Sequence, residues 1–148
     1  MNTTNSGTGY YFEDLQVGMS AAITRVVSSA DIEAFAALTG DDNPIHLDDA
    51  WASKTRFGGR IAHGMLTGGL VSAVIGTRLP GPGNIYIRQM LEFRGPVRPG
   101  DTVTAEVRIA RLEPEKKRVF LDTTCRCGDA EVLRGEAVLR VQSRAEPL

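Results

Sequence analysis

One segment, Gly64–Leu79, limits the fold more than any other part of the chain. It reads GMLTGGLVSAVIGTRL and is apolar on almost every side. A helix of this composition has to be buried, because a surface helix keeps polar residues on its solvent face. Each of its glycines lowers helix propensity by about 1 kcal/mol relative to alanine. Glycine is reasonable there if another backbone approaches closely, so the sequence predicts a central helix enclosed by a wide apolar surface.

Strands can supply that surface. After Asn84 the hydrophobic pattern changes to a period of two, which is typical of strands. The expected strands are 85–93, 102–112, 118–126 and 132–141, preceded by an earlier one at 19–27. The connections PVRPGD, EPEKK and GDAE are short turn sequences, so the neighbouring strands are antiparallel. We predict an α+β domain in which a curved antiparallel sheet wraps around the helix.

Two further helices are expected before the central one. Residues 30–38 form the first, with serines placed to cap it and Gly40 at the left-handed position that ends it. A shorter helix begins near Asp48, and Trp51 within it is interpreted as a core residue. We expect one domain over residues 10–142, with flexible tails at 1–9 and 143–148.

The overall composition excludes several classes of function. The chain has 148 residues, with 17 basic and 18 acidic side chains, which gives no support for binding nucleic acid or a membrane surface. The N-terminus MNTTNSGTG lacks the features of a signal peptide, so a cytoplasmic location is expected. Cys125 and Cys127 have no second pair to complete a zinc site, and we interpret them as structural residues with no metal.

The segment TGDDNPIH, residues 39–46, contains one of only two histidines. Pro44 restricts Asn43 to extended conformations, so the preceding helix cannot continue, and the loop can bring Asp41 and His46 together. Free aspartate and histidine titrate near ~3.9 and ~6.5, so the pair can supply a base and an acid near neutrality. Taken alone, however, these eight residues are more typical of an ordinary turn.

The segment RIAHGML, residues 60–66, contains the other histidine. His63 and Gly64 lie where the central helix begins, and the unpaired N–H groups of a helix N-terminus bind anions. Glycine also lets a ligand approach the backbone closely, so this end could hold a thioester oxygen as it becomes an enolate. For the His63 side chain, a role as a hydrogen-bonded core residue or helix cap is more typical than catalysis.

Three segments together resemble the MaoC-like (R)-specific enoyl-CoA hydratases. They are AFAALTGDDNPIHLDDAWA, RIAHGMLTGGLVSAVIG and LPGPGNIYIRQMLEFRGPVRPGDTVTAEV, and the likeness extends from about Phe12 to Val141. The family pattern GDxNPxH is intact over residues 40–46. The resemblance implies a hot-dog fold, and a homodimer or dimer-based oligomer paired through its sheets.

The resemblance also implies roles for individual residues. Asp41 and His46 would be the catalytic pair that activates water, and the Gly64 N–H would bind the thioester oxygen. The residues expected to help bind substrate are Asn43, which would orient the catalytic pair, His63, and Ser72, which would line the acyl pocket. Water would add to carbon 3 of a trans-2-enoyl-CoA and give an (R)-3-hydroxyacyl-CoA, with no cofactor and no metal. The acyl-CoA phosphates would meet some of the arginines at positions 56, 60, 88, 94 and 98.

Three alternatives stay open at this point. A dehydratase acting on an acyl carrier protein would need a basic rim, and the arginines at 56 and 60 are consistent with one. A hot-dog thioesterase shares the fold, but the intact Asp41/His46 pair is typical of hydration. A non-catalytic acyl-CoA-binding subunit would be expected to lose that pair.

Overall fold

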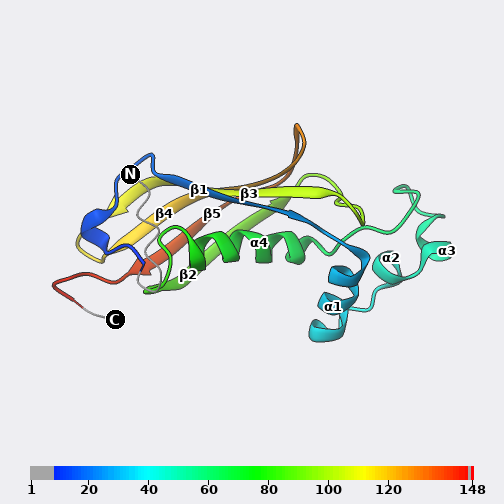
Figure 1. Ribbon diagram of the computed structural model, residues 1–148, viewed down its shortest axis with the longest axis horizontal. Helices are drawn as coiled ribbons and strands as arrows, with labels where there is room; N and C mark the ends of the chain where they lie inside the picture. Colours follow the sequence, from blue (N-terminus) through cyan, green and yellow to red (C-terminus); the bar gives the residue numbers. More distant parts are fainter. Residues whose placement is uncertain (1–8, 147) are drawn as a thin grey trace.

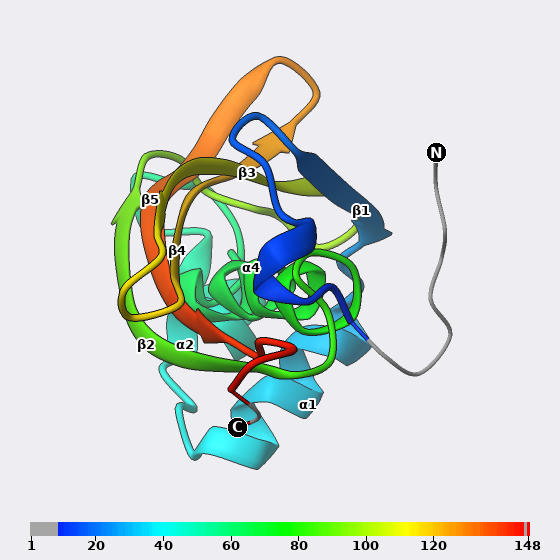
Figure 2. The same ribbon diagram turned by 90° about the vertical axis from the view of Figure 1, so that its left-hand side faces the viewer.

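The sheet surrounds one helix. The computed structural model describes residues 9–146 and 148. Its five strands form one antiparallel sheet in the order β1-β3-β4-β5-β2. Their bounds are β1 Ser20–Val26, β2 Asn84–Phe93, β3 Thr102–Glu113, β4 Arg118–Cys127 and β5 Ala130–Val141. The sheet curves around α4, Gly64–Thr77 (Figures 1 and 2). This is the predicted α+β arrangement, and each strand ends within two residues of its expected bounds.

The core lies between α4 and the concave face of the sheet. On α4, the buried side chains are Thr67, Val71, Val74 and Ile75. On β3, the buried positions alternate as Val103, Ala105, Val107 and Ile109, which accounts for the period of two in the sequence. Burial of each valine or isoleucine contributes about 1.5–3 kcal/mol, so this interface is the main source of stability.

One side of α4 is not covered within a single chain. Met65 is 58% exposed, and Gly69, Ser72 and Gly76 continue the exposed strip at helical spacing. The neighbouring edge strand β2 also exposes large apolar side chains, which are Ile85, Tyr86, Ile87, Met90 and Phe93. The expectation that the helix is fully enclosed by its own sheet is therefore wrong for this strip.

Three short helices lie together at one end of the sheet (Figure 1). They are α1 (Ser29–Thr39), α2 (Pro44–Leu47) and α3 (Asp49–Ala52). The caps of α1 are the predicted ones: Ser28 Oγ accepts from the Asp31 N–H, and Gly40 has a φ of 80°. The core interpretation of Trp51 is wrong, since it is 47% exposed. A one-turn helix at the margin of the fold buries only one residue, here Ala52.

The ends of the described chain pack onto the domain. Of the tail expected at residues 1–9, residues 1–8 lie outside the described residues, and the Gly9 N–H donates to the Pro82 carbonyl at 3.1 Å. Ser143, placed by the sequence in the second tail, is buried and its hydroxyl donates to Glu13. Arg144 binds both oxygens of Asp14, at 2.9 and 3.1 Å. The ordered contacts thus extend beyond residue 142. Within the described residues no helix has the length and apolarity needed to cross a membrane.

Candidate active site

The loop after α1 holds the Asp41 side chain in a defined place. Gly40 ends α1 by donating its N–H to the Ala36 carbonyl at 2.9 Å. The Asp41 N–H then donates to Thr39 Oγ1 at 3.2 Å, and Asp41 Oδ1 accepts from the Asn43 N–H at 3.3 Å. Asp41 is exposed, so these local bonds, rather than burial, fix the direction of its carboxylate.

The single turn of α2 positions His46. Asn43 caps it, because its Oδ1 accepts from the Ile45 N–H at 3.2 Å, and Pro44 occupies the first helical position. His46 is only 9% exposed. Its Nδ1 lies 2.7 Å from the Ile61 carbonyl, which can only accept, so Nδ1 carries the proton. Nε2 is therefore left with a free lone pair that can take a proton from water.

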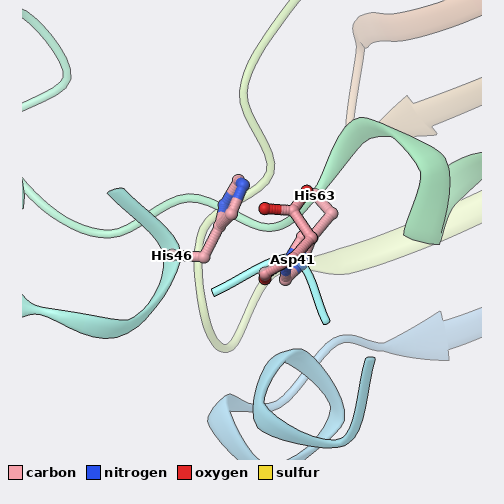
Figure 3. Close-up of side chains that lie close together, drawn as sticks. All are labelled: Asp41, His46 and His63. Carbon is pink, nitrogen blue, oxygen red and sulfur yellow. The ribbon is translucent and has the colours of Figure 1, made fainter. Parts of the chain in front are cut away.

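His63 joins these two parts of the site (Figure 3). It stands at the N-cap of α4 and is 2% exposed. Its ring is stacked on His46, with 3.7 Å between the ring centroids and 28° between the planes. Its Nε2–H donates to the Asp41 backbone carbonyl at 2.9 Å. The two histidines of the sequence therefore lie side by side, beside Asp41.

The three side chains also have to be judged as a metal site. One donor atom each from Asp41, His46 and His63 lies within 4.8 Å of the others, and two imidazoles with a carboxylate can bind a transition metal. Two of the four ring nitrogens, however, are already bonded to backbone carbonyls, His46 Nδ1 to that of Ile61 and His63 Nε2 to that of Asp41. The arrangement suits a water held between the Asp41 carboxylate and His46 Nε2 better than a metal ion.

Gly64 provides the third element, a backbone donor. As the first residue of α4 its N–H has no intrahelical acceptor, and the positive end of the helix dipole lies there. A Cβ at this position would stand 2.7 Å from two carbons of the Phe93 ring, so only glycine fits the observed packing. Gly64 and His63 border a cavity of about 670 Å³.

The comparisons with known proteins agree with this geometry. The family model described as "MaoC like domain" matches residues 14–126. The chain belongs to the MaoC-like family. The resemblance read from the sequence is therefore confirmed, and so is the hot-dog fold that it implied.

Relatives within the MaoC-like family cover most of the chain. A 3-hydroxybutyryl-CoA dehydratase from Methylorubrum extorquens is 54% identical over 92% of this chain and 87% of the relative. An (R)-specific enoyl-CoA hydratase from Rhodospirillum rubrum is 51% identical over 91% of this chain and 94% of the relative. The unliganded R-hydratase PhaJ1 from Pseudomonas aeruginosa superimposes with a TM-score of 0.87 at 42% identity, covering 92% of this chain and 88% of the other.

Four of the six expected site residues meet in this MaoC-like structure: Asp41, His46, His63 and Gly64. Ser72 does not join them. It lies eight residues beyond Gly64 on the exposed strip of α4, about 12 Å along the helix axis. The Asn43 side chain caps α2, the single turn that carries His46. Sequence reasoning missed the Ile61 carbonyl, because a backbone acceptor leaves no signal in residue type.

Cys125 provides no nucleophile for the site. Its Sγ lies 3.6 Å from the Thr67 carbonyl in the core. Burial, with a smaller contribution from Cys127, raises the pKa of the Cys125 thiol to about 12. The thiol is therefore protonated at neutral pH, and covalent catalysis by this cysteine is disfavoured.

Proposed function

We propose that this MaoC-like protein is an (R)-specific enoyl-CoA hydratase. It adds water to a trans-2-enoyl-CoA to give an (R)-3-hydroxyacyl-CoA, and the same site runs the dehydration in reverse. The observation that carries the proposal is the pairing of the Asp41 carboxylate with the free Nε2 of His46, beside the unpaired N–H groups at the start of α4. The names of the relatives support the same reaction in both directions.

Each group has a distinct part in the proposed mechanism. The Gly64 N–H binds the thioester oxygen, and a water lies between the Asp41 carboxylate and His46 Nε2. The water oxygen bonds to carbon 3 while His46 Nε2 takes its proton, and the electrons of the double bond move to the thioester oxygen. The helix terminus stabilises this enolate. The imidazolium, stabilised by Asp41, then returns the proton to carbon 2, so one water is added in total.

The charge around the cavity suits the phosphates of coenzyme A, the carrier that appears in the names of the two relatives. Two of the lining residues are charged, and both are arginines, Arg56 and Arg94. Arg56 forms no ion pair with any described residue, whereas Arg60 is engaged with Asp49 at 2.8 Å. Arg94 donates to Glu92 at 2.9 Å, which raises the pKa of Arg94. We therefore assign Arg56 as the principal contact of the CoA phosphates.

A homodimer is proposed on separate grounds. The exposed strip of α4 and the apolar edge strand β2 lie next to each other and would both be covered by a second copy. Sedimentation at several concentrations measures this directly, and a monomer at all of them would refute it. The cytoplasmic location expected from the sequence stays a prediction.

The reaction is tested by mixing the protein with crotonyl-CoA and following the loss of the conjugated double bond, with chiral analysis of the product. Asp41→Asn and His46→Gln should each lower kcat by about 10²–10⁴-fold. Circular dichroism checks that both variants stay folded. Unchanged turnover in both variants would refute the assignment. Release of free CoA thiol without hydration would indicate a thioesterase. Preference for the crotonyl thioester of an acyl carrier protein would indicate the carrier-protein dehydratase.

A further inference from the structure

His63 is a buried polar residue whose ring contacts belong to the catalytic end of the fold. Its ring lies against His46 at 3.7 Å and against Phe35 at 4.6 Å between centroids. Its Nε2–H bonds to the carbonyl of Asp41, 22 residues earlier in the chain. The following residue is Gly64, whose N–H faces the substrate in the proposed function. One side chain thus connects the Asp41 loop, α2 and the start of α4.

The observed contacts disfavour the simpler roles for this histidine. It is not a helix cap, because its side chain makes no hydrogen bond to the first turn of α4. It is also poorly suited to bind substrate, the role expected from the sequence. Nε2 is bonded to Asp41, and Nδ1 is buried without a partner among the described residues.

We propose that His63 is a positioning residue that holds Asp41 and His46 in register with each other and with Gly64. This inference rests on the proposed hydratase function. Among the described residues the His46 ring has one hydrogen-bond partner, the Ile61 carbonyl at Nδ1, which leaves the ring free to pivot about that bond. The stacked His63 ring fixes the plane, and its hydrogen bond ties the Asp41 backbone to α4. A displacement of about 1 Å in such a constellation costs on the order of 10²-fold in rate.

Two substitutions separate the hydrogen bond from the ring. His63→Phe keeps an aromatic ring against His46 but has no donor for the Asp41 carbonyl. His63→Gln places an amide N–H near the position of Nε2 and so retains the donor. With crotonyl-CoA, we expect His63→Phe to lower kcat about 10–100-fold while KM stays within about threefold. His63→Gln should recover at least about fivefold of that loss.

A second readout does not depend on catalysis. Amide hydrogen exchange over residues 39–47 should be faster in His63→Phe than in wild type, because the loop has lost its bond to α4. His63→Gln should show an intermediate rate. If His63→Phe does not fold, His63→Asn replaces it, since its shorter amide does not reach the Asp41 carbonyl.

Each outcome decides the proposal. Wild-type kcat in His63→Phe would mean that the ring only fills space, and a raised KM at unchanged kcat would mean that His63 binds substrate. Either result overturns the positioning role. Unchanged exchange over residues 39–47 would overturn it as well. Failure of wild-type protein to hydrate crotonyl-CoA would refute the hydratase assignment instead, and the exchange measurement would still test the connection between His63 and the Asp41 loop.

Discussion

Replacing Gly64 with alanine should lower the activity strongly and leave the stability nearly unchanged. The new Cβ would lie 2.7 Å from Phe93 Cδ1 and Cε1, and ordinary contact begins at 3.4 Å, so the ring has to move by about 3.4 − 2.7 = 0.7 Å. Phe93 is 52% exposed and can swing outward at small cost. Alanine also gains up to about 1 kcal/mol of helix propensity over glycine. The free energy of unfolding should therefore change by less than about 1 kcal/mol.

The activity of Gly64→Ala should fall much further. The methyl group projects beside the N–H that is proposed to bind the thioester oxygen, and it would keep the substrate at a greater distance. Loss of one such donor costs about 10²–10³-fold in kcat, or about 2.7–4 kcal/mol. Hydration of crotonyl-CoA measures kcat, and urea unfolding measures stability.

Gly59→Ala is the matched control for this change. Its Cβ would meet only Arg98 Nη1 at 3.7 Å, an ordinary contact, so both quantities should stay near wild type. Wild-type kcat in a folded Gly64→Ala protein would refute the assignment of the Gly64 N–H as the oxygen-binding donor. A loss of several kcal/mol of stability would instead show that the Phe93 ring cannot move.

Three further predictions follow from individual contacts. Arg56→Gln should raise the KM for crotonyl-CoA about 5–10-fold. The KM for the short N-acetylcysteamine thioester, which lacks phosphates, should not change. The control variant Arg108→Gln, on β3, should leave both KM values unchanged. Asn43→Ala removes the cap of α2 and should destabilise the fold by about 0.5–2 kcal/mol, measured by urea unfolding. It should also lower kcat, and an unchanged kcat would show that the cap does not contribute to catalysis. The hydrogen bond from Arg144 lowers the pKa of Asp14 below its ordinary 3.8, so its contribution to stability is present above pH 3.8 and is lost as pH falls through the lower folded value. Asp14→Asn should therefore be less stable than wild type at pH 7, and the difference in unfolding midpoint should vanish well below pH 3.8.

The parts of the fold that depend on local chemistry could be predicted from the sequence. Ser28 and Gly40 bound α1 as expected, because a cap acts within four residues of its helix end. The strands follow from alternation that matches the buried face of the sheet. The helix α2 was missed, since a helix of four residues that begins with a proline gives no periodic signal. Trp51 was placed wrongly because hydrophobicity alone does not tell where an element lies relative to the core.

The candidate site also has one part that local sequence predicts and another part that depends on tertiary contacts. Proximity of Asp41 and His46 follows from five residues of spacing and a proline, so a local argument reaches it. The tautomer of His46 cannot be predicted by a local argument, because it is set by the Ile61 carbonyl, 15 residues away. The stacking of His63 on His46 likewise depends on a tertiary contact, between α2 and the start of α4. Sequence patterns thus locate the reacting groups, and tertiary contacts decide which atom of each group is free to react.

The apolar character of α4 has two separate causes, and only one is satisfied within a single chain. Its inner face packs on the sheet, which accounts for Val71, Val74 and Ile75. The sheet does not account for the strip of Met65, Gly69, Ser72 and Gly76, which carries small or apolar groups and remains exposed. Small residues at helical spacing permit a close approach by another surface, and the edge strand β2 also exposes large apolar side chains. This strip therefore supports the proposed homodimer, because a helix that met only its own sheet would need no apolar residues on this face.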